Sequence, residues 1–346
     1  MKIGNTDVNH NSPVFIIAEL SANHNGSLDT AIETIKAAKR AGADCIKLQT
    51  YTADTMTIDS RKPGFTIEGT IWDGKNLYEL YQEAYTPWEW HETLFKTAKE
   101  EGLICFSSPF DKSAVDFLES LEVPAYKIAS FEITDIPLIE YVASKGKPVI
   151  ISTGIAATQD IELALSACKR MGNYNIAVLK CTSSYPAPIE EANMTMVKDI
   201  AERYNVISGL SDHTIGNTAP VVATCFGAKI IEKHFILDRS IGGPDASFSM
   251  NEEEFKNMVD AVREAEKAIG SVDYNLTEKQ KKGRDFSRSI YVVNDIKEGE
   301  ILTEENIKSI RPGYGMHPKF YKEILGRKAS MNLEKGDPMS FNAIAK

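Results

Sequence analysis

Two histidines, His213 and His234, are the side chains in this sequence best suited to hold a metal ion. Each stands at the end of a short β-like run, over residues 206–213 and 229–234, and the small apolar stretch 218–227 between the runs could form a connecting helix. Both imidazoles would then lie on one rim of a parallel sheet. Neutral imidazole is the commonest metal ligand in proteins, and two can share a divalent ion while positions stay open for substrate. A pair of hydrogen-bonded structural histidines is the alternative.

Two lysines near strand ends, Lys47 and Lys127, indicate that the same rim binds an anion. An ammonium group that points inward from an apolar strand needs an anionic partner, because burying an unpaired charge is costly. Serine hydroxyls end several of the same runs, although a single hydroxyl there is more often a helix cap. Lysines and hydroxyls that converge on one rim predict a phosphate or carboxylate site.

Eight short apolar runs, alternating with amphipathic stretches, would position these side chains. The runs span residues 14–20, 45–51, 103–109, 125–130, 148–153, 176–183, 206–213 and 229–236. The amphipathic stretches span residues 28–41, 88–101, 113–121, 137–144, 160–171 and 196–204. This alternation predicts an α/β fold, a parallel (β/α)8 TIM barrel with its chemistry at the carboxyl ends of the strands. A doubly wound sheet is the alternative, but no GxGxxG follows the first run.

The pattern changes towards the end of the chain. We predict a barrel domain over residues 1–272, a polar linker over 273–285 and a small β-rich domain over 286–346, where short strands alternate with glycine turns. The last segment is too short to bury much core of its own, so it must dock onto another surface.

The connection over residues 52–87 is the longest in the barrel and carries Trp72, Tyr78 and Tyr81. Connections of this length are usually functional or disordered, and the aromatic residues argue against disorder. We interpret it as a lid over the substrate, with an insertion packed on the side of the barrel as the alternative.

The composition is that of a globular protein, with 42% hydrophobic and 25% charged residues among 346. Lys and Arg number 39 against 49 Asp and Glu, which gives a net charge of −10. Without a basic run, this charge argues against nucleic acid or an anionic membrane as a partner. Five cysteines without CxxC spacing are typical of a reducing compartment, and no stretch has signal-peptide character, so we expect a cytoplasmic protein.

A series of motifs resembles the sialic acid synthase family. In chain order these are IAELSANHNG (17–26), IKLQTY (46–51), YKIAS (126–130), STG (152–154), CTSSYP (181–186), GLSDHT (209–214), EKHF (232–235) and RPGYG (311–315). Their order and spacing hold over nearly the whole chain, and the last segment resembles the antifreeze-like (SAF) domain of that family. Residues 72–91 are most similar to the branch that makes pseudaminic acid, rather than N-acetylneuraminate or legionaminate.

The resemblance implies an enzyme that condenses phosphoenolpyruvate with an open-chain N-acetylated sugar and releases phosphate by C–O cleavage. In the pseudaminate branch the sugar would be a 2,4-diacetamido-2,4,6-trideoxy-altrose. The resemblance implies that His213 and His234 hold Mn²⁺, with Mg²⁺ or Co²⁺ as alternatives, to polarise the sugar aldehyde. It also implies that Glu19 contacts the sugar and moves protons.

The same resemblance assigns substrate contacts. Those for phosphoenolpyruvate are Lys47, Ser108, Lys127, Ser130, Ser152, Ser183 and Ser211, the first two towards its carboxylate. Those for the sugar are Gln49, Glu132, Tyr185, Asp245, Phe286 and Arg311. Family members can have asparagine where this chain has Ser183. The terminal domain in this family covers the active site of the partner, so Phe286 and Arg311 would act in trans, in a domain-swapped homodimer.

Two other functions fit parts of the pattern. A Schiff-base aldolase could use Lys127 or Lys180 on the same barrel. A non-catalytic sugar-phosphate sensor with a protein-binding terminal domain is the alternative from another class, since a fold alone does not decide function.

Overall fold

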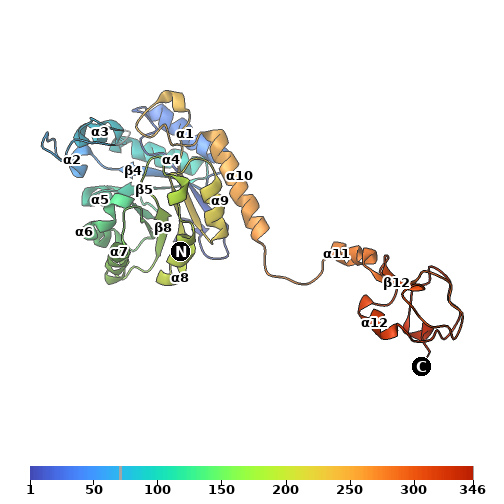
Figure 1. Ribbon diagram of the computed structural model, residues 1–346. Coiled ribbons are helices and arrows are strands. Elements are labelled where there is room, and N and C mark those ends of the chain that lie inside the picture. The colour runs from blue at the N-terminus through green and yellow to red at the C-terminus, as the bar shows by residue number, and fades with distance from the viewer. Residues whose placement is uncertain (70–71, 346) are drawn as a thin grey trace. The chain divides into compact units, whose positions relative to one another are not determined.

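Eight parallel strands form a closed barrel, which confirms the predicted TIM-barrel fold (Figure 1). The computed structural model describes residues 1–69 and 72–345. Strand β10 closes the wall by pairing with both β3 and β9. In chain order the strands of the barrel are β3 (Phe15–Glu19), β4 (Cys45–Thr50), β5 (Ile104–Pro109), β6 (Tyr126–Ile128), β7 (Val149–Ser152), β8 (Ile176–Cys181), β9 (Ile207–Asp212) and β10 (Ile230–His234).

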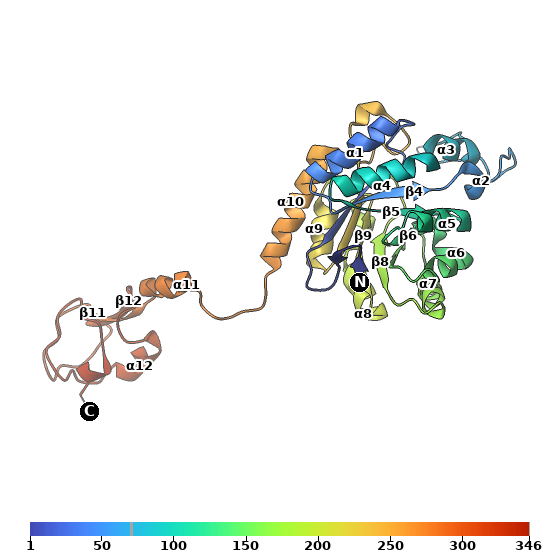
Figure 2. The ribbon, with the colours of Figure 1, turned by 180° about the vertical axis from the view of Figure 1, so that it is seen from behind.

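Helices cover the outside of the barrel, and Figure 2 shows α1 and α4 lying side by side there. The covering helices are α1 (Leu28–Arg40), α4 (His91–Glu100), α5 (Lys112–Ser120), α6 (Ile136–Ala143), α7 (Thr158–Arg170), α8 (Thr195–Tyr204), α9 (Thr218–Cys225) and α10 (Glu252–Ile269). The predicted helical stretches overlap these bounds. The connection after β4 carries two more short helices, α2 (Ala53–Met56) and α3 (Leu77–Ala84).

Side chains of the capping residues determine where several helices begin. The Asn251 side chain accepts a hydrogen bond from Glu254 N, and the Glu254 side chain accepts one from Asn251 N, which forms a capping box at the start of α10. Asp111 caps α5 and Ser27 caps α1 in a similar way. Each of these caps lies at the end of a segment that leads from a strand to the next helix. Such a segment at the rim of the barrel is therefore held by the strand at one end and by the helix cap at the other.

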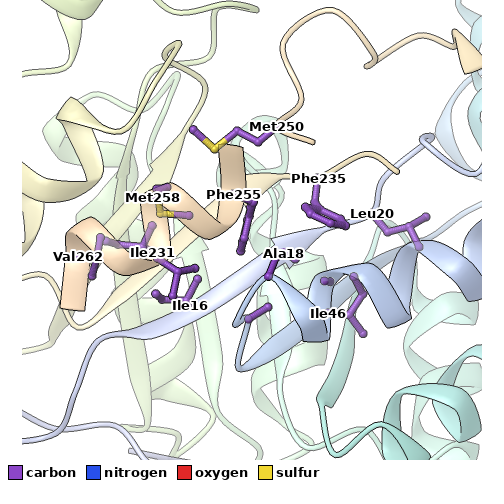
Figure 3. Close-up of a cluster of buried hydrophobic side chains, with 14 of the residues drawn as sticks. Ile16, Ala18, Leu20, Ile46, Ile231, Phe235, Met250, Phe255, Met258 and Val262 are labelled. Atoms are coloured by element: carbon purple, nitrogen blue, oxygen red, sulfur yellow. The ribbon is translucent and has the colours of Figure 1, made fainter. Parts of the chain in front are cut away.

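Alternating side chains divide the barrel core into an inner and an outer layer. Figure 3 shows part of the outer layer, in which Ile16 and Ile231 of the paired strands β3 and β10 pack with Phe255 and Met258 of α10. The strand residues of the inner layer include Phe15, Ile17, Cys45, Phe106, Ile150, Ala177, Leu179 and Ile230, and Ala125 joins them just before β6. These residues lie in the amino-terminal and middle parts of the strands, so the inward polar positions fall at the carboxyl ends.

A short hairpin precedes the barrel and is absent from the sequence prediction. It consists of β1 (Lys2–Ile3) and β2 (Thr6–Asp7), and strands this short give no periodic pattern. Ile3 and Val8 are fully buried in the inner apolar layer. The backbone of Gly4 has a φ of +58° and packs beside Ile104 at the start of β5. The hairpin therefore covers the amino-terminal end of the barrel, away from the carboxyl ends of the strands.

The chain divides into two compact units, Met1–Gly270 and Ser271–Lys346. The second unit contains α11 (Glu278–Gly283), the antiparallel pair β11 (Ser289–Val292) and β12 (Ile307–Ile310), and the short helix α12 (Tyr321–Ile324). It has a buried cluster of its own, which includes Ile290, Leu302 and Ile307. No helix in the described part of the chain is long and apolar enough to cross a membrane.

Candidate active site

Polar side chains that point into the barrel gather at the carboxyl ends of the strands. Glu19 follows Ile17 of the inner apolar layer by two residues, and Lys47 follows Cys45 in the same way. The side chains of Lys127 on β6 and Glu232 on β10 contact each other, although these strands are not neighbours, so the contact crosses the interior. We call this carboxyl-end opening the mouth of the barrel.

Four buried charged side chains form the centre of the mouth, and we call them the charge cluster: Glu19, Lys47, Lys127 and Glu232. Lys47 Nζ lies 2.7 Å from Glu19 Oε2 and 3.7 Å from Glu232 Oε1. Lys127 Nζ lies 3.1 Å from the same oxygen of Glu232. The four side chains are at most 7% exposed, so each charge depends on the others for compensation.

Hydrogen bonds from neighbouring strands hold the charge cluster in place. Gln49 Nε2 donates to Glu19 Oε1 at 2.8 Å, and Lys47 Nζ donates to Ser108 Oγ at 3.2 Å. Ser211 Oγ donates to Glu232 Oε1 at 3.1 Å. Three of the residues assigned to substrates thus contact the cluster directly.

The two carboxyl groups of the charge cluster have opposite pKa shifts. Burial raises the pKa of Glu19 to about 7, against the opposing effect of Lys47. Burial acts in the same direction on Glu232, but Lys127 and Lys47 together outweigh it and lower the pKa of Glu232. Since Glu232 has two ammonium partners, it is the permanently ionised carboxylate. Glu19 is the group able to gain and lose a proton near neutral pH.

The two lysines also differ. Burial acts to lower the pKa of Lys47, but Glu19 and Glu232 outweigh it and raise the pKa. For Lys127 burial outweighs the attraction of Glu232, so the pKa is lowered. Lys127 therefore carries the less compensated ammonium, which an additional anion would stabilise.

Three serines lie at or just beyond the carboxyl ends of β6, β7 and β8: Ser130, Ser152 and Ser183. Ser183 Oγ donates to Ser130 Oγ at 2.9 Å, and Ser152 Oγ is buried without a hydrogen-bond partner. A Cβ atom at Gly154 would lie 2.1 Å from Ser183 Oγ and 2.5 Å from Ser130 Oγ, so a side chain there would displace the pair. A buried hydroxyl without a partner is the kind of group that a bound ligand satisfies.

The two histidines lie side by side at the mouth, at the ends of the neighbouring strands β9 and β10, with ring centroids 5.3 Å apart. His213 Nδ1 lies 2.9 Å from the carbonyl oxygen of Thr182, to which it must donate, so Nε2 carries the lone pair whenever the ring is neutral. Burial acts to lower the pKa of His213, but Cys181 and the Thr182 carbonyl outweigh it and raise the pKa. Burial lowers the pKa of His234 well below its usual value, so its imidazole is neutral. The buried His234 Nδ1 has no hydrogen-bond partner and lies 3.8 Å from Asp245 Oδ2.

Aromatic rings form a wall beside the histidines. The Tyr185 ring lies 4.3 Å from the His213 ring and 5.1 Å from the Phe248 ring, measured between centroids. Trp72 lies 5.8 Å from Tyr185, and its Nε1 donates to the carbonyl oxygen of Pro244 at 3.1 Å. The long connection after β4 thus reaches the mouth, at the position that a lid would need.

The remaining assigned sugar contacts lie in different places. Glu132 follows β6 in the short helix Ser130–Thr134, and burial raises its pKa to about 7 against the opposing charge of Lys127. Its Oε2 atom is buried without a hydrogen-bond partner. Phe286 and Arg311 are exposed residues of the second unit, so their role at the mouth stays a prediction.

Comparison with known proteins assigns the chain to a family. A model of the NeuB family matches residues 34–274. The chain belongs to the NeuB family. A model of the SAF domain matches residues 287–345, and the resemblance to sialic acid synthases with a terminal SAF domain is confirmed.

Relatives of this NeuB-family chain match along almost its full length. It is 52% identical over 339 residues to the pseudaminic acid synthase of Campylobacter jejuni, covering 98% of each chain. It is 51% identical to the pseudaminic acid synthase of Helicobacter pylori, covering 96% of this chain and 98% of that one. The solved structure of N-acetylneuraminic acid synthetase from Leptospira borgpetersenii has 30% identity and a TM-score of 0.73, and covers 82% of this chain and 94% of that one.

Glu232 is the site residue that sequence reasoning missed. The two lysines were expected to take their anionic partner from a substrate, whereas Glu232 already contacts both. The signal was present, because Glu232 precedes His234 by two residues on one strand and therefore shares its inward face.

Lys180 does not share the mouth with Lys127. It alternates with Leu179, which belongs to the inner apolar layer, so its side chain leaves the strand on the outer face. Its Nζ donates to the carbonyl oxygen of Cys181 at 2.6 Å and to Thr182 Oγ1 at 2.9 Å. The Lys180 ammonium therefore forms its hydrogen bonds with the wall of the barrel and does not point into the mouth.

The donor set in the mouth fits a divalent ion held by two imidazoles. Oriented His213 and neutral His234 are suitable nitrogen ligands, and hydrogen bonding of the second ring nitrogen is the usual support for such a ligand. Within residues 1–69 and 72–345 no group of three or more His, Cys, Asp or Glu side chains could hold a metal ion. A metal at the two histidines would therefore keep several positions open for substrate or water.

Proposed function

We propose that this chain condenses phosphoenolpyruvate with an open-chain 2,4-diacetamido-2,4,6-trideoxy-altrose to give pseudaminic acid and phosphate. The observation that carries the proposal is that one mouth holds both an anion-binding set, Lys127 with its neighbouring hydroxyls, and a pair of imidazoles. Membership of the NeuB family and the identity to pseudaminic acid synthases support the choice of substrates.

Phosphoenolpyruvate binds beside Lys127 and Lys47, where the positive charge of Lys127 is not fully balanced by the protein's own carboxylates. Its phosphate contacts Lys127 and the hydroxyls of Ser130, Ser152, Ser183 and Ser211. Its carboxylate contacts Lys47 and Ser108. The unsatisfied hydroxyl of Ser152 supports this placement, as does the close approach of Gly154 to the hydroxyls of Ser183 and Ser130, which no side chain covers. Binding would also give Lys127 a second anionic partner in addition to Glu232, and Lys47 a third in addition to Glu19 and Glu232.

The sugar lies between the charge cluster and the aromatic wall. Gln49 contacts Glu19 of the charge cluster, Tyr185 packs against His234 in the aromatic wall, and Asp245 lies near His234. Glu132 carries a buried carboxyl oxygen without a partner, which suits a hydrogen bond from a sugar hydroxyl or amide. Trp72 would close the space from the long connection.

The reaction forms one carbon–carbon bond and breaks one carbon–oxygen bond. The methylene carbon of phosphoenolpyruvate attacks the aldehyde carbon of the sugar, whose oxygen takes up a proton. Water then adds to the cationic carbon that carries the phosphate, and the tetrahedral intermediate expels phosphate. Glu19, whose pKa is raised to about 7 by burial, supplies and recovers these protons from its position beside Lys47.

His213 and His234 would hold the metal, and synthases of this family are generally metal-dependent. When bound, a divalent ion such as Mn²⁺ supplies Lewis-acid stabilisation of the negative charge that develops on the aldehyde oxygen. The hydrogen bond from His213 to the carbonyl of Thr182 fixes the orientation of its ring for this task.

A second copy of the chain would complete the site. Exposed apolar side chains follow four consecutive barrel strands, at Phe131, Ile155, Ile189 and Ile215. Such a rim favours a protein partner, and the second unit exposes the aromatic side chain of Phe286. We therefore expect a homodimer in which Phe286 and Arg311 act at the partner's mouth.

Parallel reactions with three sugars test the substrate assignment. Purified protein with phosphoenolpyruvate and Mn²⁺ is incubated with N-acetylmannosamine, a 2,4-diacetamido-6-deoxymannose or the altrose isomer, and products are identified by mass spectrometry. The proposal expects a product from the altrose isomer alone. A product from either of the other sugars alone would move the chain to the neuraminate or legionaminate branch.

A further inference from the structure

A buried ion pair lies on the outer face of the barrel wall, directly behind the two histidines. Lys233 Nζ is 2.5 Å from Asp212 Oδ2, and each side chain is 1% exposed. Strand alternation explains this placement, because His213 and His234 point inward while Asp212 and Lys233 point outward. The two charged residues are register partners on β9 and β10, and each is adjacent in sequence to one histidine.

The Lys233 ammonium binds more than its carboxylate partner. It also donates to the carbonyl oxygen of Thr214, and to the carbonyl oxygen of Gly216 at 3.4 Å. Asp212 Oδ1 in turn accepts a hydrogen bond from Thr214 N at 2.9 Å. The pair therefore holds the three residues after His213 against β10, in a closed ring of hydrogen bonds.

These contacts determine the positions of both histidines. His213 stands just beyond the end of β9, where the regular pairing of the strands with each other has ended. Its backbone is held by Asp212 and Thr214 on either side, and both of these contact Lys233. The Lys233 side chain leaves β10 one residue before His234. A single side chain thus joins the backbone segments that carry the two imidazoles.

We propose that Asp212 and Lys233 are positioning residues for the metal site. They fix the distance between His213 and His234 and the orientation of the two imidazoles, which bind the metal. This inference rests on the proposed role of the two histidines as metal ligands. Neither charged residue reaches the mouth, so both act through their neighbours. Groups that hydrogen-bond directly to metal ligands typically change metal affinity about 10–100-fold when they are replaced, and we expect an effect of that order here.

A replacement that keeps the fold is available for this pair. Removing one partner alone would leave an uncompensated buried charge and threaten folding. In the double variant D212L/K233M both charges are replaced by apolar side chains of similar size, an exchange that is often neutral for stability. It nevertheless removes every side-chain bond to Thr214 and Gly216 described above.

The test measures Mn²⁺ binding to the full-length protein without substrates. Free Mn²⁺ is followed by electron paramagnetic resonance for the wild type, D212L/K233M, H213A and E119L/K147M. The last variant makes the same kind of exchange at the half-buried pair Glu119–Lys147 on the outside of the barrel. We expect D212L/K233M to weaken Mn²⁺ binding at least about tenfold, and E119L/K147M to match the wild type. Thermal midpoints confirm that each variant is folded.

A kinetic readout separates positioning from general damage. In D212L/K233M the Mn²⁺ concentration for half-maximal activity rises, while kcat at saturating Mn²⁺ stays close to that of the wild type. Equal Mn²⁺ affinity in D212L/K233M and the wild type would overturn this inference. If H213A also binds Mn²⁺ like the wild type, the metal role of the histidines fails instead. Loss of kcat at saturating Mn²⁺, with unchanged Mn²⁺ affinity, would likewise contradict the positioning role.

Discussion

Oε1 of Glu232 lies 3.1 Å from Nζ of Lys127, so an ammonium assigned to the substrate already has a carboxylate partner within the protein. The same oxygen accepts a hydrogen bond from Ser211. Glu232 therefore compensates the buried cations while no substrate is present, and an incoming anion adds to a site that is already arranged. We therefore expect the barrel to be stabilised both by Glu232 and, when it is bound, by phosphoenolpyruvate.

Replacing Glu232 by glutamine should lower stability and increase the stabilisation by substrate. Loss of one partner from a buried ion pair costs about 3–5 kcal/mol, and phosphoenolpyruvate can replace the lost charge. Thermal midpoints are measured with and without phosphoenolpyruvate. We expect the ligand to raise the midpoint of E232Q more than that of the wild type. The control E119Q alters the more exposed pair with Lys147 and should respond like the wild type; an equal response of E232Q would contradict the compensation.

Lys127 and Lys180 should behave differently on replacement by methionine. Lys127 faces the mouth, whereas Lys180 is bound to the outer side of the wall. Loss of a charged contact to the phosphate is expected to lower kcat/KM for phosphoenolpyruvate in K127M by about 100-fold, since such contacts contribute about 1.5–3 kcal/mol. K180M should stay within a few-fold of the wild type. Steady-state kinetics check both.

Borohydride treatment with pyruvate tests the aldolase alternative on the same two lysines. The proposed condensation forms no imine, so we expect no reduced adduct on Lys127 or Lys180 by peptide mass spectrometry. A stoichiometric adduct that is absent from K127M would establish Schiff-base chemistry in place of the synthase reaction.

Stability should fall as the pH rises from 4.5 to 7, in part because of Glu132. Burial raises the pKa of Glu132 from 4.5 to about 7, so over this range the folded protein keeps a proton that the unfolded chain has lost. The contribution is complete below pH 4.5 and is lost as the pH passes 7, a difference of roughly 3 kcal/mol. Glu19 acts in the same direction.

Urea unfolding of the barrel at pH 5 and pH 8 measures this effect. E132Q should show a smaller difference in unfolding free energy between the two pH values than the wild type. Glutamine at the exposed residue Glu190 serves as the control and should leave the difference unchanged. An E132Q variant with the full wild-type difference would show that the Glu132 carboxyl does not titrate in this range.

Mixing two inactive variants tests the contribution of a second copy. R311A lacks the proposed trans contact and E19A lacks the proton carrier, so a mixed dimer contains one mouth with both residues intact. We expect the mixture to recover part of the wild-type activity after subunit exchange. If heterodimers form, as seen by native mass spectrometry, and no activity returns, each site is built within one chain.

The fold could be predicted because its signals repeat. Eight apolar runs mark eight strands, and parallel strands place all their carboxyl ends on one side, so the inward position of Lys47 and Lys127 followed from alternation alone. The terminal hairpin could not be predicted in this way, because its two strands contain two residues each. It is held by the burial of Ile3 and Val8, which depends on the finished barrel.

Parts of the site depend on contacts across the barrel that no local pattern contains. The partnership of Lys127 with Glu232 joins residues 105 positions apart in sequence. The outward ion pair of Asp212 and Lys233 was not predicted, because the sequence does not show that the outer side of the wall is buried at these positions. Because side chains alternate along a strand and the two histidines point inward, Asp212 and Lys233 could have been assigned to the outer face of the wall.

Phosphate release is the measurement that tests the central claim most directly. Metal-free protein is supplied with phosphoenolpyruvate and the diacetamido altrose, and free phosphate is followed before and after addition of Mn²⁺. We expect one phosphate per sugar consumed, only when both substrates and Mn²⁺ are present, and almost none with H234A under the same conditions. Absence of phosphate release with this sugar and with the other acetamido sugars, or full release by chelator-treated H234A, would contradict the account.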